Sequence, residues 1–80
     1  MANEASGKRG KIVGVSVTIN GEARQLEAAL KLSELLAQLG IESTKIAVER
    51  NLEIVPRSQY ARVTLADGDR LEIVQFIGGG

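Results

Sequence analysis

The chain has 80 residues, which is enough for one small domain with a modest core and predicts a single domain. Its 10 Lys and Arg residues balance 10 Asp and Glu residues, so no net field draws it toward nucleic acid or an anionic membrane. It contains neither Cys nor His, which excludes disulfides, thiolate nucleophiles, Cys/His zinc sites and imidazole acid–base catalysis.

The sequence shows neither a membrane helix nor a secretory signal. No apolar run approaches the roughly 20 residues that span a bilayer. The first seven residues lack the apolar core of a signal peptide. A cytoplasmic location is therefore expected.

Residues 1–11 form a polar N-terminal arm that includes Lys8, Arg9 and Lys11. Such a composition cannot bury enough apolar surface to offset the entropy of an ordered backbone, so we predict that the arm is disordered. A small basic contact for a phosphate or an acidic partner is the alternative. We predict the folded domain over residues 12–77 and a separate glycine tail over residues 78–80.

The domain is predicted to open with a β-hairpin. Apolar residues alternate strictly from Val13 to Ile19, which is typical of a strand with one buried face. Asn20-Gly21 follows, and both residues tolerate the positive φ angles of a tight turn. Residues 22–27 should therefore return antiparallel.

One short amphipathic helix is predicted to cover the sheet. Four leucines between Leu32 and Leu39 recur at i, i+3, i+4 and i+7. Gly40 stands where a left-handed residue ends a helix, whereas Lys31 is a poor N-cap, so the start is less sharply marked. Core packing is the expected role of the leucine stripe, and a partner groove is the alternative.

Two short β-prone runs, residues 46–48 and 53–55, flank a polar bend at residues 49–52. Pro56 removes a ladder donor, so the second run should end there or lie at an edge. We expect a loop after it, with Tyr60 half-buried beneath.

The last predicted strand, residues 70–77, follows the turn Asp67-Gly68-Asp69. The two carboxylates of this turn are too few oxygen ligands for a hard cation, so turn formation is their expected role and no metal site is predicted. The order of elements indicates an α+β fold with a mixed sheet of four to five strands on one main helix.

The two faces of the last strand are both partly apolar. Leu71 and Ile73 point to one face, and Val74 and Phe76 point to the other. If the first pair faces the helix, the second lies on the open face of the sheet. Exposed apolar residues there are either a partner site or ordinary surface hydrophobics.

After Ile77 come Gly78, Gly79 and Gly80. A run of glycines adds nothing to folding stability, so the tail is either inert or functional. In the functional interpretation, a terminal carboxylate is an anion at neutral pH and can attack the α-phosphate of ATP. Glycine also lets the backbone thread a narrow channel. Activation must then come from another protein, because the chain has no phosphate-binding loop.

Several short motifs occur in a defined order: Asn20-Gly21-Glu22, Ala47-Val48, Glu53-Ile54-Val55-Pro56-Arg57-Ser58, Asp67-Gly68-Asp69-Arg70-Leu71-Glu72-Ile73-Val74 and the closing Gly-Gly-Gly. Together they resemble ThiS, the sulfur carrier family of thiamine biosynthesis, over most of the chain from Val15 onward. Tyr60 stands where the family often has Trp, and the polar arm is an addition to the family pattern.

The resemblance implies a ubiquitin-like β-grasp fold and a carrier that is not an enzyme. A ubiquitin-activating-like adenylyltransferase of the ThiF type would adenylate Gly80 with ATP and magnesium, and this chain itself would bind no cofactor. A cysteine desulfurase or rhodanese-like protein would supply the sulfur of a thiocarboxylate, and a ThiG-type thiazole synthase would accept it. Gly78 and Gly79 would form the linker, and Val74, Phe76 and Ile77 the docking surface.

Three alternatives stand beside this interpretation. The small subunit of molybdopterin synthase also ends in diglycine, but its tail usually follows a Pro-containing segment that residues 74–77 lack. Sulfur carriers for cysteine synthesis or tRNA thiolation share the chemistry and differ in the acceptor. A non-catalytic β-grasp interaction module would use the open sheet face and not the tail.

Overall fold

The structure is a computed structural model that describes residues 14–76. The elements in chain order are β2 (Val15–Ile19), β3 (Glu22–Leu26), α2 (Leu32–Leu39), the 3₁₀ turn Ser43–Lys45, β4 (Ile46–Arg50), β5 (Glu53–Val55), the 3₁₀ turn Arg57–Gln59 and β6 (Arg70–Gln75). The arm at residues 1–11, the outer limits of the predicted domain, and Ile77 to Gly80 lie outside the described residues.

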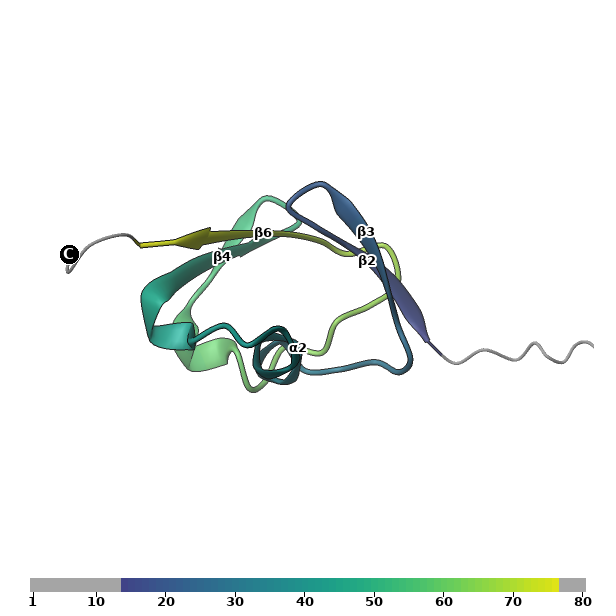
Figure 1. The fold of residues 1–80 in the computed structure, drawn as a ribbon, viewed down its shortest axis with the longest axis horizontal. Coiled ribbons are helices and arrows are strands. Elements are labelled where there is room, and N and C mark those ends of the chain that lie inside the picture. The colour runs from purple at the N-terminus through teal and green to yellow at the C-terminus, as the bar shows by residue number, and fades with distance from the viewer. Residues whose placement is uncertain (1–13, 77–80) are drawn as a thin grey trace, which may run out of the picture.

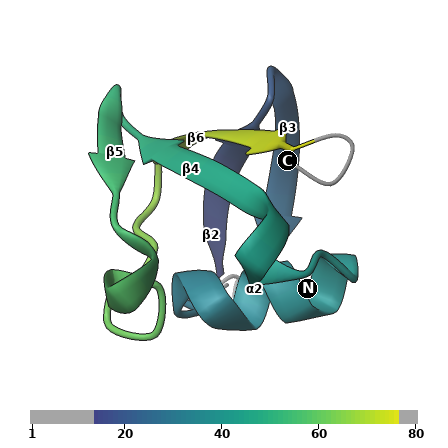
Figure 2. The same cartoon turned by 90° about the vertical axis from the view of Figure 1, so that its left-hand side faces the viewer.

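The strands form one mixed sheet of five strands in the order β3-β2-β6-β4-β5. The last strand, β6, lies at its centre, parallel to β2 and antiparallel to β4. Figures 1 and 2 show α2 packed against one side of this sheet. The predicted α+β class, with a mixed sheet on one main helix, is therefore confirmed.

The predicted first hairpin forms as expected. Asn20 and Gly21 both have positive φ, 49° and 86°, and β2 pairs with β3 from Val15 with Leu26 to Ile19 with Glu22. The Asn20 side chain also reaches β6, where its amide donates to the Ile73 carbonyl and its oxygen accepts from the Ile73 N–H. The turn residue thus ties the hairpin to the central strand.

The helix has the predicted limits. Leu32, Leu35 and Leu36 are buried, and Gly40 ends the helix with φ 74°, its N–H donating to the Ala37 carbonyl. At the start, the Lys31 side chain gives no cap; instead the Glu34 carboxylate accepts the Lys31 N–H at 2.8 Å. This backbone donor is satisfied from within the first turn, which is half of a capping box.

The second hairpin is tighter than expected. We predicted a bend over residues 49–52, whereas Glu49 and Arg50 belong to β4 and only Asn51 and Leu52 form the turn. The strand continues because Glu49 and Arg50 pair with both β5 and β6. Tyr60, expected to be half-buried, is buried in the core. The core residues are Val17, Ile19, Leu26, Leu32, Leu35, Leu36, Ile46, Val48, Val55, Tyr60, Leu65, Leu71 and Ile73.

Candidate functional site

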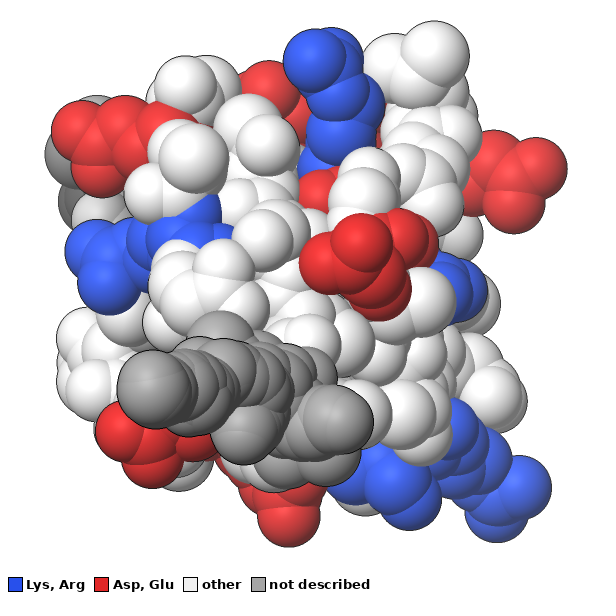
Figure 3. All heavy atoms as spheres, turned by 90° about the vertical axis from the view of Figure 1, so that its right-hand side faces the viewer, with Lys and Arg blue, Asp and Glu red and all other residues white. Residues whose placement is uncertain are grey.

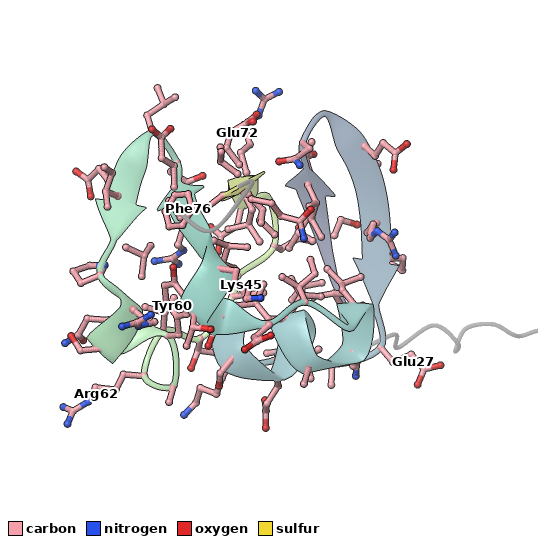
Figure 4. The ribbon with its side chains drawn as sticks, turned by 60° about the vertical axis from the view of Figure 1, so that its left-hand side comes forward. Glu27, Lys45, Tyr60, Arg62, Glu72 and Phe76 are labelled. Carbon is pink, nitrogen blue, oxygen red and sulfur yellow. The ribbon has the colours of Figure 1, made fainter. Side chains whose placement is uncertain are left out.

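The predicted last strand, residues 70–77, is shorter in the structure, where β6 ends at Gln75 and Phe76 follows outside the strand. Leu71 and Ile73 are buried against α2, and Val74 and Phe76 are each 58% exposed on the opposite face, as predicted. In Figure 4, Glu72 lies on the side of the sheet away from α2. The Phe76 N–H donates to the Lys45 carbonyl at 2.8 Å, so the backbone is hydrogen-bonded up to the last described residue. The predicted tail site, Gly78 to Gly80, and the docking residue Ile77 follow outside the described range.

Two further apolar side chains share the open face, and sequence reasoning did not select them. Leu52 is 89% exposed and Ile54 is 71% exposed. With Val74 and Ala47 they line a hollow of about 440 Å³ on β4, β5 and β6. A signal for Ile54 was present: adjacent apolar residues in a strand point to opposite faces, so either Ile54 or Val55 had to face outward. Nothing in the sequence pattern marked Leu52.

Leu52 has an unusual backbone conformation. Asn51 and Leu52 have φ angles of 52° and 73°, as in the two-residue hairpin turns that normally contain Asn-Gly. A left-handed conformation costs a residue with a Cβ roughly 1–2 kcal/mol. The Leu52 side chain is almost fully exposed, so its burial offsets little of this conformational cost. Such strain, held in place by the surrounding structure, points to a use for the side chain outside the domain.

Replacing Leu52 with Gly is expected to raise the free energy of unfolding by about 0.5–1 kcal/mol, since the gain in backbone conformation exceeds the entropy cost of glycine. Urea denaturation measures the change. Leu52→Ala is the matched control, because it removes the side chain but keeps the Cβ, and it should give no increase. A Gly variant no more stable than the Ala variant would show that the turn is unstrained.

Asp69 holds this hairpin in place. Its carboxylate is buried, with 5% of the residue exposed. It accepts hydrogen bonds from the Ala66 N–H at 2.8 Å, the Arg50 Nε at 2.9 Å and the Asn51 side-chain amide at 3.0 Å. The Asn51 side-chain oxygen accepts the Arg70 N–H at 2.9 Å. The tip that carries Leu52 is therefore fixed against the start of the central strand.

The electrostatics of Asp69 follow from these contacts. Burial by itself raises the pKa of the carboxyl group, but the hydrogen bonds from Ala66, Asn51 and Arg50, together with the Arg50 charge, lower it below its usual value of 3.8. The neighbouring Asp67 accepts the Ser16 N–H at 2.7 Å. Of the two carboxylates, Asp69 bonds within its own turn, to the Ala66 N–H, whereas Asp67 bonds Ser16 of β2. Residues 14–76 contain no group of three or more Asp and Glu side chains that could hold a metal ion.

A second hollow, of about 520 Å³, lies between β3 and α2 at the other edge of the sheet. Glu22, Arg24, Gln25 and Gln38 contribute polar side chains to its lining. Figure 3 shows the end of the molecule at which β2 begins, where basic and acidic side chains are interspersed. Among the described helices, none is long and apolar enough to cross a membrane.

Comparisons with known proteins agree on one family. A model described as the ThiS family matches residues 17–80. The chain is 58% identical over 66 residues to a thiazole synthase of Paramagnetospirillum magneticum, covering 82% of this chain and 20% of that protein. It is 45% identical over 49 residues to the sulfur carrier protein ThiS of Bacillus subtilis, covering 61% of this chain and 74% of that protein.

A solved structure gives the same result. The crystal structure of the thiamine biosynthesis protein ThiS from Geobacter metallireducens has a TM-score of 0.71 and 33% identity, covering 82% of this chain and 100% of that one. This similarity confirms the predicted β-grasp fold. The chain spans about a fifth of the length of the two thiazole synthases that it matches.

Proposed function

The chain belongs to the ThiS family of sulfur carriers, and from this premise we propose that it carries sulfur for the formation of the thiazole of thiamine. It acts as a protein co-substrate in the cytoplasm. The observation that carries the proposal is that the glycine tail follows two residues after the end of β6, the central strand of the sheet.

The reacting group is the carboxylate of Gly80. It attacks the α-phosphate of ATP, bound with magnesium to a ThiF-type adenylyltransferase, and pyrophosphate leaves. The outer sulfur of a persulfide on a cysteine desulfurase or rhodanese-like donor then attacks the acyl carbon and displaces AMP, which gives an acyl disulfide. A second thiol supplied by a partner attacks the donor's sulfur and forms a disulfide with it, and this exchange releases the thiocarboxylate at Gly80. The chain contains no Cys and no His, so partners supply the thiol and imidazole groups that the cycle uses.

The partners dock on the open face of β6. Val74 and Phe76 present apolar side chains there, immediately before the tail, and Ile77 follows them. Burial of this surface contributes roughly 25 cal/mol per Å² of apolar area removed from water. Gly78 and Gly79 lead from the docking surface to the reacting carboxylate, and the absence of a Cβ lets them enter a narrow channel.

The thiazole synthase of Paramagnetospirillum magneticum supports the choice of acceptor. A segment similar to this chain makes up 20% of that protein. In that relative, a carrier-like segment and the rest of a thiazole synthase therefore belong to one polypeptide. This favours thiazole synthase over molybdopterin synthase, cysteine synthesis or tRNA thiolation as the destination of the sulfur.

Intact-mass analysis of the protein incubated with the activating enzyme, ATP and a sulfur source tests the proposal. We expect a mass increase equal to the replacement of one oxygen by sulfur, localised to Gly80 by fragmentation. A variant lacking Gly79 and Gly80 is the control and should gain nothing. An unmodified protein under these conditions contradicts the carrier function and leaves the interaction module as the better interpretation.

A further inference from the structure

Two carboxylates stand directly opposite each other on the open face. Glu49 of β4 pairs with Glu72 of β6 in the antiparallel ladder, so their Cβ atoms lie roughly 4.5–5.5 Å apart. Like charges in this position destabilise a sheet. The salt bridge found within residues 14–76 joins Arg50 to Asp69 and leaves both glutamates without a cationic partner there.

The same two glutamates line the apolar hollow on this face. Its other side chains include Ala47, Leu52, Ile54 and Val74. Register explains the arrangement, because Glu49 pairs with Ile54 on one side and Ala47 pairs with Val74 in the adjacent row. The hollow therefore combines an apolar rim with two carboxylates, and it includes Leu52, whose strained backbone leaves its side chain in solvent.

We propose that this face binds a partner surface on which an arginine or lysine is surrounded by apolar side chains. The cation lies between Glu49 and Glu72, and Leu52, Ile54 and Val74 contact the apolar groups around it. The inference rests on the proposed function and assigns this surface to the sulfur-accepting thiazole synthase.

Charge complementarity selects this occupant. A second copy of the chain, packed face to face, would bring two more carboxylates onto the same surface and increase the repulsion. A free divalent cation would find two carboxylates in an apolar hollow, fewer oxygen ligands than calcium takes. A basic side chain set among apolar groups matches both the charge and the lining.

The test measures binding of the full carrier chain to the thiazole synthase of the same organism by titration calorimetry, over a series of salt concentrations. We expect the double variant Glu49→Gln, Glu72→Gln to bind at least about 10-fold more weakly at low salt, with a shallower salt dependence. The matched control, Glu22→Gln with Glu27→Gln on and beside β3, should bind within about twofold of the unmodified chain.

Urea denaturation separates this result from misfolding, because removing the repulsion should leave the double variant at least as stable as the unmodified chain. If the double variant binds as tightly as the unmodified chain, the inference is wrong. The carrier function is then still supported, provided that the unmodified chain is adenylated. An unmodified chain that is never adenylated overturns both. If the double variant and a chain lacking residues 1–11 both bind more tightly, the basic arm occupies the face, and the partner assignment is wrong.

Discussion

Replacing Gly79 with Val is expected to lower adenylation by the activating enzyme by about 100-fold or more, the loss produced when a reacting group is displaced by about an ångström. The branched side chain of valine lies next to Gly80, the residue that must present its carboxylate to ATP. Valine also allows fewer backbone conformations than glycine does. ATP–pyrophosphate exchange measures the loss.

Two further variants complete this test. One residue added after Gly80 moves the carboxylate away from the α-phosphate and should abolish exchange as well. The matched control is Gly7→Val, the same substitution in the N-terminal arm, and it should leave exchange unchanged. Circular dichroism and the urea midpoint should be unaltered in all three proteins, because the last core residue of β6 is Ile73. Normal exchange by Gly79→Val would refute the assignment of the tail.

Replacing Asp69 with Asn is expected to cost about 2–3 kcal/mol of unfolding free energy, the largest effect on stability predicted for a single polar side chain of this domain. Asn keeps one acceptor oxygen, but its NH2 group replaces the other and then faces a donor among the Ala66 N–H, the Arg50 Nε and the Asn51 amide; the negative charge that pairs with Arg50 is also lost. The Arg50 side chain is 32% exposed, so solvent screens part of the ion pair, and we place the loss below that of a fully buried pair.

Urea denaturation provides the measurement, and Asp67→Asn is the matched control two residues away. Asp67 is exposed and accepts one bond, from the Ser16 N–H, so its replacement should cost less than about 1 kcal/mol. A similar loss for both variants would mean that the buried network around Asp69 contributes no more than an exposed turn.

The pH dependence of stability follows from the same carboxylate. The pKa of Asp69 is lowered in the folded state from its usual value of 3.8, so the unfolded chain takes up this proton first as the pH falls. The contribution of Asp69 is therefore complete above its unfolded pKa and is lost as the pH drops through the folded one. We expect the difference between the urea midpoints at about pH 7 and about pH 3 to be smaller for Asp69→Asn than for the unmodified chain. An unchanged pH dependence in the variant would contradict this.

Local patterns predicted the elements whose causes are local. Alternation from Val15 to Ile19 with Asn20-Gly21 gave the first hairpin, and the leucine spacing with Gly40 gave the helix and its end. The outward direction of Val74 followed from period two once Leu71 and Ile73 were assigned to the core. In these cases the sequence neighbours of a residue determine its conformation.

The features that escaped prediction depend on contacts between distant segments. Asp69 is 19 residues from Arg50 and 18 from Asn51, so its role as an anchor arises only when β4 and β6 pair. That network also holds the Asn51-Leu52 turn, where propensity favours Gly over Leu. The Glu49 and Glu72 pair likewise arises from strand register, and no spacing rule along the chain indicates it.

The central place of β6 has a mechanical consequence. In the proposed cycle the tail is drawn into one enzyme after another, and such a pull would place tension along the last strand. Because β6 runs parallel to β2 and is bonded to β4 on its other side, a pull at Phe76 against the start of β2 loads both ladders in shear. Many hydrogen bonds then resist together and do not open one at a time, so the domain can be pulled by its end without unravelling.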